Sequence, residues 1–520
     1  MDSSSTSSES GFEKNNSGQK TQGYMLPSTI ESLNHCDVNK VGSLLYLYTI
    51  VFIICLCGLM FGYDTGTLGG LIDLTSFKEA FGDEYLEYTD RFEVEMKFKD
   101  LTKGILISAS SLGGFFGGGI TMIICNPLGP KIPIFIAAVF HIAGATLELF
   151  SGAWFEVAIG RTLIGMSIGM FCVACPMLIS DLAPTNVRGT LVSIFQLMVT
   201  VGIMIGAITL YCFEKNIPHT SALQFAGPMM VSFSLGVLMA ILIWLVPNSP
   251  VWYFRKYGNI EDTIKLIAEV RCLKEDDPSV IKVAQLIYED VQNEKRESSG
   301  NQGNQSSDQA SIIKGQPMFL LRTFTGVLLF VFQQCSGINY FFFFGTSIFA
   351  SVIDDAYLVP IFFASINLLF SILASTYVDE FKRTTLLKIG SIALGSIIGV
   401  FAVIKLLDFN NTATNVSMII LSCSFIAIFA FTWGPVANIV VSELFPPSIK
   451  VKAMSTSGCS GWVAGFLVTT ITPLISKYIG FAFMIIMGLS AFFVKKYVPD
   501  TRNLQINELN DVYRKFQNKS

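Results

Sequence analysis

The segment Gln333-Gln334-Cys335-Ser336-Gly337-Ile338-Asn339-Tyr340 lies inside an apolar run that extends from residue 320 to residue 350. A run of this length is sufficient to cross a lipid bilayer, which needs roughly 20 apolar residues. The segment places Gln333, Gln334 and Asn339 within the run, and burying an amide without a hydrogen-bond partner costs about 1–3 kcal/mol. Amides donate and accept hydrogen bonds without carrying a charge, so the segment predicts a polar interior. Gly337 is expected to let the helix bend or break beside it.

Further apolar runs resemble this one, and together they predict an all-α membrane protein with about twelve transmembrane helices. Hydrophobic residues make up 51% of the 520 residues and charged residues 14%, well below the roughly 25% charged residues of soluble proteins. The runs do not alternate between polar and apolar residues, which favours helices over strands. The expected spans are 43–63, 104–125, 132–152, 155–179, 190–212, 228–247, 320–350, 356–378, 386–404, 416–441, 454–476 and 478–498.

The two halves of the chain repeat each other. The segment 181–188 (DLAPTNVR), after the fourth span, has an acid, Leu, Pro and a base at the same offsets as 443–450 (ELFPPSIK), after the tenth. Pro247-Asn248-Ser249 likewise matches Pro499-Asp500-Thr501. Duplicated halves around a central site are typical of secondary transporters. The expected domains are a disordered cytosolic N-terminus (1–42), an N-terminal six-helix bundle (43–247), a cytosolic linker with short amphipathic helices (248–319), a C-terminal six-helix bundle (320–498) and a cytosolic tail (499–520).

Charge placement predicts the topology. The linker and the tail are rich in Lys and Arg, so both termini are expected to be cytosolic. The Ser-rich start is not typical of a cleavable signal peptide. Residues 292–311 are low in complexity and predicted to be disordered. The sequons at Asn410 and Asn415 would then face outside and could carry glycans, whereas those at Asn15, Asn304 and Asn518 should stay unmodified.

Several function classes are disfavoured by the sequence. It contains no G-x-x-x-x-G-K-[ST] loop and no soluble catalytic domain, which argues against a primary pump and against an enzyme. Cys172 and Cys175 form a C-x-x-C, but in the middle of a predicted span, where small-residue packing is the better interpretation than a redox or metal site. We therefore expect no cofactor, no metal and no nucleic-acid partner, and a monomer embedded in lipid.

Four motifs are similar to those of the sugar porter family of the major facilitator superfamily, and the chain most resembles the fungal hexose transporters over residues 43–505. The motifs are 62–70 (GYDTGTLGG), 184–189 (PTNVRG) followed by Gln196, the segment 333–340, and Trp433-Gly434-Pro435 with 443–446 (ELFP). The resemblance implies the major facilitator fold, with two pseudo-symmetric six-helix bundles. It also implies transport of a monosaccharide such as glucose by alternating access in the plasma membrane, as a facilitator or a proton symporter.

The same resemblance assigns site residues. Sugar-binding positions are Gln196, Gln333, Gln334, Asn339, Asn367, Asn438 and Trp462. Any one of the amides could instead be a hydrogen-bonding residue between helices. Asp64 and Arg161 match a proton-coupling pair, although a structural or gating pair is equally consistent with ionisable residues in spans. Charges expected to latch the cytosolic ends of the two halves in an outward-open state are Asp181, Arg188, Asp379, Arg383, Glu443 and Lys450.

The chain also departs from the family pattern. Asn438 replaces a tryptophan expected to stack on the sugar, Phe343-Phe344 replace a tyrosine pair, and the segment 379–384 (DEFKRT) lacks the family's glycine. These changes leave open a sugar sensor that binds hexose with little transport, and a carrier of another solute. The short tail after Val498 argues against the sensor, because fungal sensors of this family carry a long cytosolic tail.

Overall fold

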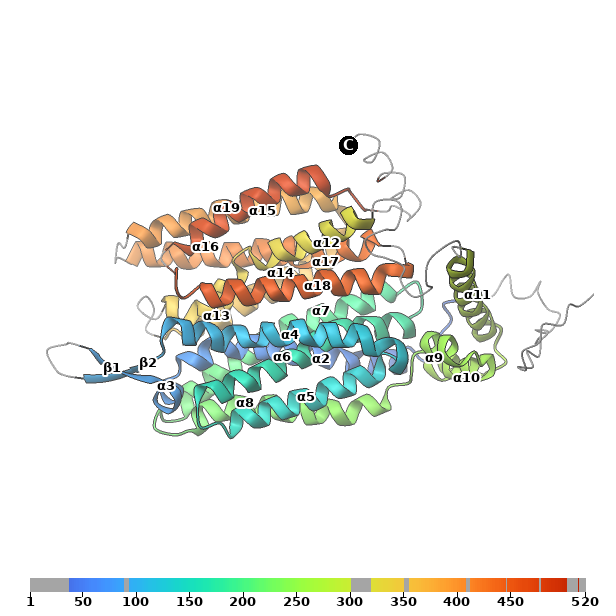
Figure 1. Ribbon diagram of the computed structural model, residues 1–520, viewed down its shortest axis with the longest axis horizontal. Coiled ribbons are helices and arrows are strands. Elements are labelled where there is room, and N and C mark those ends of the chain that lie inside the picture. Colours follow the sequence, from blue (N-terminus) through green and yellow to red (C-terminus); the bar gives the residue numbers. More distant parts are fainter. Residues whose placement is uncertain are drawn as a thin grey trace, which may run out of the picture.

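The computed structural model describes residues 37–87, 93–300, 319–349, 355–407, 412–445, 447–476, 478–502 and 513. Within these ranges the chain is mostly helical, and its long helices run side by side along one axis (Figure 1). The first half contains α2 (Leu44–Asp73), α4 (Asp100–Leu128), α5 (Lys131–Leu149), α6 (Trp154–Leu182), α7 (Arg188–Asn216) and α8 (Leu223–Leu242), which continues into the 3-10 turn η1 (Ile243–Leu245).

The second half contains two helices that are each broken in the middle: α12 (Phe319–Gln334) is followed by α13 (Ile338–Phe349), and α16 (Thr412–Phe431) by α17 (Trp433–Leu444). The unbroken helices are α14 (Leu358–Tyr377), which continues into the 3-10 turn η2 (Val378–Glu380), α15 (Arg383–Leu407), α18 (Pro447–Ile471) and α19 (Ile479–Tyr497). Counting each broken helix once, the described residues form twelve long segments, and each corresponds to one predicted span. The prediction of an all-helical membrane fold is confirmed.

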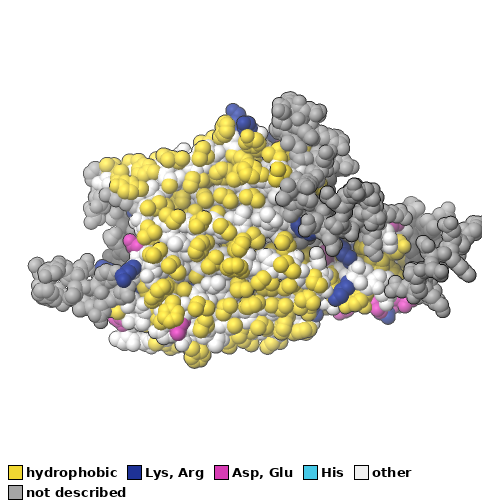
Figure 2. Space-filling model, in the orientation of Figure 1, with side chains coloured by type: hydrophobic (Ala, Val, Ile, Leu, Met, Phe, Trp, Pro, Cys, Tyr) yellow, Lys and Arg dark blue, Asp and Glu magenta, His cyan; other side chains and the backbone are white. Residues whose placement is uncertain are grey.

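Eleven of the twelve segments are long and apolar enough to cross a membrane. The twelfth, α18, is less apolar because its first half is rich in serine, threonine and glycine. This helix packs against α4 and α12, so its polar stretch lies among other helices of the bundle. Hydrophobic side chains cover the flank that faces the viewer in Figure 2, and charged side chains gather toward the two ends. That distribution is expected of a bundle whose flank contacts lipid.

The two halves each form a bundle, and in the described residues the largest contacts between them involve three helix pairs. Within the first half α2 packs on α7 and α6 packs on both α4 and α5, whereas within the second half α15 packs on α19 and α14 on α16. The halves meet where α4 packs on α18, α7 on α14 and α2 on α13. Figure 1 shows the first half, in blue and green, below the second half, in yellow to red.

The break between α12 and α13 occurs where the sequence places glycine. Gly337 has a φ of 101°, a conformation that L side chains rarely adopt. A Cβ at this position would also lie 2.7 Å from the ring of Phe483. The expectation that Gly337 breaks this helix is confirmed. The second break, at Thr432 between α16 and α17, was not predicted.

One end of the bundle carries a small extension between α2 and α4, and we call it the hairpin end. It consists of α3 (Thr75–Phe81) and the antiparallel strands β1 (Asp83–Glu87) and β2 (Glu93–Lys97). The sequence predicted no helix or strand between the spans 43–63 and 104–125. Figure 1 shows the extension at the left of the bundle.

The opposite end, the linker end, carries three amphipathic helices between the halves: α9 (Pro250–Tyr257), α10 (Ile260–Arg271) and α11 (Pro278–Gly300). They are anchored to the first half, because Trp252 Nε1 donates to the Asn126 carbonyl over 2.9 Å and Lys256 Nζ to the Pro127 carbonyl over 2.8 Å. All three helices lie within the predicted linker 248–319.

The prediction of disorder over 292–311 is wrong for residues 292–300, which form the end of α11. Glutamate, lysine, arginine and glutamine are good helix formers, and they outweigh the low complexity of this stretch. Residues 301–318 lie outside the described part of the chain. The same is true of the sequons at Asn15, Asn304, Asn410 and Asn518.

Candidate functional site

The break at Gly337 and the break at Thr432 are joined by an amide. Gln333 Nε2, in the last turn of α12, donates to the carbonyls of Trp433 and Gly434, each over 3.0 Å. Gln333 is only 8% exposed, so these two bonds satisfy the donors of an otherwise costly buried amide. Asn438 Nδ2, one turn further along α17, donates to the same Gly434 carbonyl over 3.0 Å. The structure therefore brings Gln333 and Asn438 together.

A second pair of predicted amides meets across the helix break itself. Asn339 Nδ2, at the start of α13, donates to Gln334 Oε1 over 2.9 Å. Both side chains are half-buried. Gln334 Oε1 also lies close to Gly465 of α18, where a Cβ would approach it to 3.3 Å. The predicted amides Gln333, Gln334, Asn339 and Asn438 thus gather around one broken helix of the second half.

Trp462 contributes an aromatic surface between the halves. It projects from α18 against α4, where a Cβ on Gly114 would lie 2.6 Å from the indole ring. Its ring centroid is 5.8 Å from that of Phe61 on α2, with the planes tilted by 55°. Gly114 therefore allows the indole to lie flat against the first half. Phe61 was not predicted, and aromatic content alone could not have identified it.

Two predicted amides lie away from this cluster. Gln196 on α7 is exposed, and Asn367 on α14 is buried. Gln196 and Asn367 lie on two helices that pack on each other across the halves. Among the described residues, no hydrogen bond joins either side chain to the amides around Gly337.

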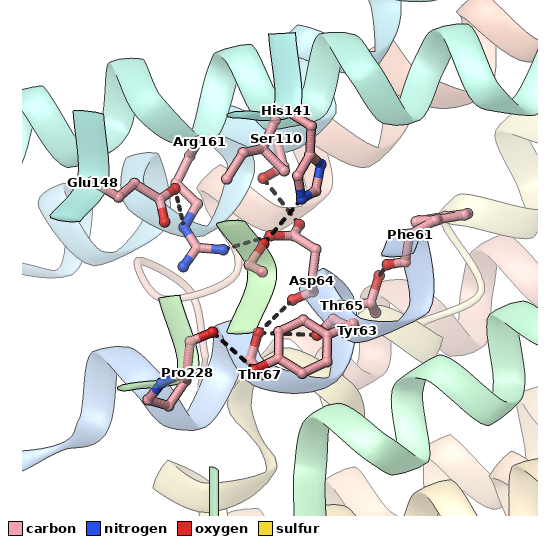
Figure 3. Close-up of polar contacts among 12 residues, drawn as sticks. Phe61, Tyr63, Asp64, Thr65, Thr67, Ser110, His141, Glu148, Arg161 and Pro228 are labelled. Carbon is pink, nitrogen blue, oxygen red and sulfur yellow. Dashed lines mark hydrogen bonds and ion pairs between the residues drawn. The ribbon is translucent and has the colours of Figure 1, made fainter. Parts of the chain in front are cut away.

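The two ionisable residues predicted as a pair do form one. Arg161 Nη1 of α6 donates to Asp64 Oδ1 of α2 over 2.6 Å, and both side chains are 4% exposed (Figure 3). The structure adds a second acid that was missed: Glu148 of α5, with Oε1 2.9 Å from Arg161 Nε. Ser110 of α4 lies at 3.5 Å from the other oxygen of Asp64. An acid inside the predicted span 132–152 was the signal that could have identified Glu148.

A buried histidine lies beside this group and was also missed. His141 of α5 contacts Ser167 Oγ of α6 at 3.1 Å and Ser232 Oγ of α8 at 3.0 Å. Both ring nitrogens therefore have partners, and the residue joins three helices of the first half. Figure 3 places His141 close to Ser110 and Asp64.

At the hairpin end, one carboxylate joins the two halves. Asp73, the last residue of α2, accepts hydrogen bonds from Thr346 over 2.8 Å and from Ser347, both on α13. Lys103 of α4 pairs with Asp73 and donates to Ser347 over 2.6 Å. We call Asp73, Lys103, Thr346 and Ser347 the hairpin-end clamp. Nothing in the sequence analysis anticipated it.

Two acids predicted for the linker end, Asp181 and Glu443, have partners in or next to their own halves. Asp181 accepts a hydrogen bond from Ser249, and Arg383 Nη2 lies 3.5 Å from Glu443 Oε1. Arg188, at the start of α7, is exposed. The side chains of Asp379 and Lys450 lie outside what the structure describes. The cross-half latch therefore stays a prediction for another conformation.

Metal-ligating residues do not cluster in the described part of the chain. Within it, no three His, Cys, Asp or Glu side chains are arranged to hold a metal ion. Cys172 and Cys175 are free thiols on α6.

Comparison with known proteins agrees with this architecture. A family profile described as sugar (and other) transporter matches residues 50–513. A low-affinity glucose transporter of Kluyveromyces lactis is 31% identical over 88% of this chain and 80% of its own, and one of Saccharomyces cerevisiae is 32% identical over 90% and 82%. A galactose transporter of S. cerevisiae is 30% identical over 90% and 81%.

Solved structures agree at the level of the fold. The xylose transporter XylE from E. coli, in a partially occluded inward-open conformation, has a TM-score of 0.71 over 89% of this chain and 100% of its own, at 24% identity. A family profile that matches most of the chain, relatives at about 30% identity and a similar fold agree with one another. The chain therefore belongs to the sugar transporter family.

Proposed function

We propose that this protein moves a monosaccharide across a membrane by alternating access. The observation that carries the proposal is the group of amides around the broken helix α12–α13, together with Trp462 on α18, a helix that packs on α12, in a member of the sugar transporter family. A hexose presents hydroxyls, which need donors and acceptors, and C–H faces, which pack on aromatic rings. The sensor alternative is not favoured, since the relatives above are named as transporters.

The amides would bind sugar by exchanging partners. Gln334 and Asn339 bond to each other, so an arriving hydroxyl can replace that bond without leaving either amide unsatisfied. Gln333 and Asn438 have their N–H groups on the Gly434 carbonyl, which leaves their side-chain oxygens to accept from a ligand. Gln196 and Asn367 would contact the sugar from the α7–α14 side.

The conformational cycle would open and close the two ends in turn. The hairpin-end clamp holds the halves together at one end in this structure, with Lys215 and Asp355 forming a second cross-half pair 3.3 Å apart. At the linker end, by contrast, Asp181 and Glu443 pair within their halves. This arrangement is consistent with a state closed at the hairpin end. Opening there would require the clamp to break and the linker-end charges to pair across the halves.

The finer assignments are part of the same proposal. We place the linker end in the cytosol and the hairpin end outside, with the protein in the plasma membrane, because the basic linker and tail favour the cytosolic side. Asn415, in the first turn of α16, would then be on the outer side, where glycans are added. We propose a monomer with no cofactor and no catalytic activity.

The test is uptake of labelled glucose, galactose, fructose and xylose by a yeast strain that lacks its own hexose transporters. Expression should restore uptake of at least one sugar, and Asn339→Ala should reduce it at least about tenfold, the equivalent of about 1.4 kcal/mol. Asn216→Ala is the matched control, since this exposed amide at the end of α7 bonds, in the described part of the chain, only to its own helix at Cys212. No uptake of any sugar by a protein that reaches the membrane would refute the proposal.

A further inference from the structure

We propose that Glu148 carries the proton that couples sugar movement to a proton gradient, by sharing the single guanidinium of Arg161 with Asp64. The inference rests on the proposed function only in that the coupled solute is a sugar. It concerns a carboxylate on α5 that neither the sequence motifs nor the amide site involves.

The geometry gives Arg161 two acidic partners on different helices. Its Nη1 is 2.6 Å from Asp64 on α2, and its Nε is 2.9 Å from Glu148 on α5. The Glu148 side chain is 2% exposed and crosses α6 above Gly160, where a Cβ would lie 2.7 Å from Glu148 Cγ. Glycine at this position therefore permits the approach. Figure 3 shows Arg161 between the two carboxylates.

The charges of this group do not balance when every member is ionised. Two carboxylates and one guanidinium leave a net charge of minus one within the membrane-spanning part of the bundle, where isolated charge is expensive. The other polar groups nearby are neutral or already bonded: the Tyr63 hydroxyl donates to the Pro228 carbonyl, and His141 bridges two serines. One proton on one of the carboxyls restores neutrality. Two carboxyls that share a site in this way hold one proton between them.

Several observations favour Glu148 over Asp64 as the holder. Asp64 has the shorter contact to Arg161 and the additional hydroxyl of Ser110, both of which favour its ionised form. Among the described residues, Glu148 has only the contact with Arg161 Nε, and its Oε1 makes no well-aligned hydrogen bond. Glu148 is also next to the end of α5, on the side of the hairpin end, so it lies nearer to the aqueous face there.

A place for one water molecule is present beside the group. A small cavity there has room for about one water molecule and is lined by both polar and apolar side chains. The polar ones are Asp64, Thr67, Glu148, Arg161 and Ser232. A water here would accept a proton from the outer side and pass it to the Glu148 carboxylate, which becomes neutral. The reverse transfer to water restores the carboxylate.

The proton can influence the halves through α2. This helix carries Asp64 in its middle and Asp73 of the hairpin-end clamp at its end, and it packs on α13 of the other half. When Glu148 is protonated, Arg161 binds Asp64 alone and holds α2 firmly on α6. When Glu148 loses its proton, it competes with Asp64 for Arg161, and α2 is held less firmly. Proton occupancy thereby biases a helix that joins the two halves.

The test compares Glu148→Gln with Glu156→Gln in liposomes that contain the purified protein. Glutamine has the shape of a protonated glutamate, and Glu156 is a nearby carboxylate that bonds to the Gly152 amide instead of Arg161. With an inward gradient of about one pH unit, wild type and E156Q should concentrate sugar up to about tenfold, if one proton accompanies each sugar. E148Q should reach a ratio of about one, while its sugar exchange without a gradient falls less than about threefold.

Infrared spectroscopy gives a readout that needs no sugar. At neutral pH, wild type and E156Q should show the carbonyl stretch of a protonated carboxyl that shifts in heavy water, and E148Q should lack it. Uphill accumulation by E148Q, or retention of the band in E148Q, would overturn the inference. A wild type that exchanges sugar but neither concentrates it nor shows the band would overturn it too, and would leave the proposed function intact. A wild type that moves no sugar would refute the proposed function, and the band would still decide the role of Glu148.

Discussion

Replacing Asp73 by alanine should release the hairpin end and shift the protein toward a state that is open there. Asp73 accepts from Thr346 and Ser347 across the contact between the halves, while Lys103 holds its charge in place. The carboxylate is 11% exposed and Lys103 is 18% exposed, so water replaces these bonds only in part.

The magnitude follows from the bonds that are lost. A hydrogen bond to a charged group contributes about 1.5–3 kcal/mol when buried, and two such bonds cross the halves here. Partial replacement by water reduces the sum, and we expect a net loss of roughly 2 kcal/mol from the closed state. This corresponds to about a 30-fold change in the equilibrium between closed and open forms. Lys215→Ala is the control, because that ammonium is 61% exposed in its pair with Asp355 and should have little effect.

Distances between spin labels measure the shift directly. Phe150 and Tyr478 are exposed positions at the hairpin end of the first and second halves, and labels there should separate when that end opens. The exposed native cysteines Cys212 and Cys272 would be replaced first. In wild type the short distance should dominate, and in D73A a longer one should gain population. An unchanged distribution in D73A, or an equal change in the Lys215 control, would refute the assignment of the clamp.

Three further predictions concern the amide site and the linker. Gln333→Ala removes both bonds that join the two helix breaks, and we expect uptake to fall at least about tenfold and stability by about 1–3 kcal/mol, measured by transport and by thermal unfolding in detergent. Unchanged values would mean that the breaks do not depend on this amide. Asn438→Trp should tighten hexose binding about three- to tenfold by restoring an aromatic face, as measured by ligand competition; no gain would show that the cavity is repacked or that the ligand is not a hexose. The Lys40 ammonium lies 2.7 Å from Asp277 and holds the pKa of that carboxyl below its ordinary value. The ion pair therefore stabilises the attachment of the linker helices at pH values above the ordinary aspartate pKa. This stabilisation is lost as the pH falls through the lowered pKa. Hydrogen exchange of α10 and α11 should therefore increase in acid below about pH 4, and it should do so less in Lys40→Ala.

Apolar runs and glycine were sufficient to predict the helices and one of their breaks. A run of about 20 apolar residues has few alternatives in lipid, and Gly337 adopts the backbone conformation that its residue type favours. The break at Thr432 was missed although Gly434 and Pro435 follow it, and Pro435 has no N–H to donate to the Phe431 carbonyl four residues before it. Only the structure shows that Gln333, from another helix, bonds to the start of α17 beside this break.

The sequence predicted the part of the candidate site in which a residue's type and position alone show that it needs a partner. Asp64 and Arg161 were identifiable as a pair because ionisable residues in spans need partners. Glu148 was missed because the sequence was interpreted as one acid paired with one base. The Arg161 guanidinium has several N–H donors and binds a second acid through its Nε. Asp73 was missed because it lies at the end of a helix, where an acidic residue does not by itself indicate a partner. Its partners on α13 are known only from the structure.

The anchoring of the linker has a practical consequence for observing the protein at work. Trp252 and Lys256 bind α9 to the end of α4, and the Gly42 amide donates to the Arg271 carbonyl over 2.8 Å, which attaches α10 to the start of α2. All of these contacts belong to the first half, so α9 and α10 should travel with it as one body. A fluorophore on Lys265, which is 57% exposed on α10, would then serve as a lever arm that magnifies small rotations of that body. Paired with a second dye on the tail side of α19, it would convert each turnover into a change of energy transfer without any probe in the permeation pathway.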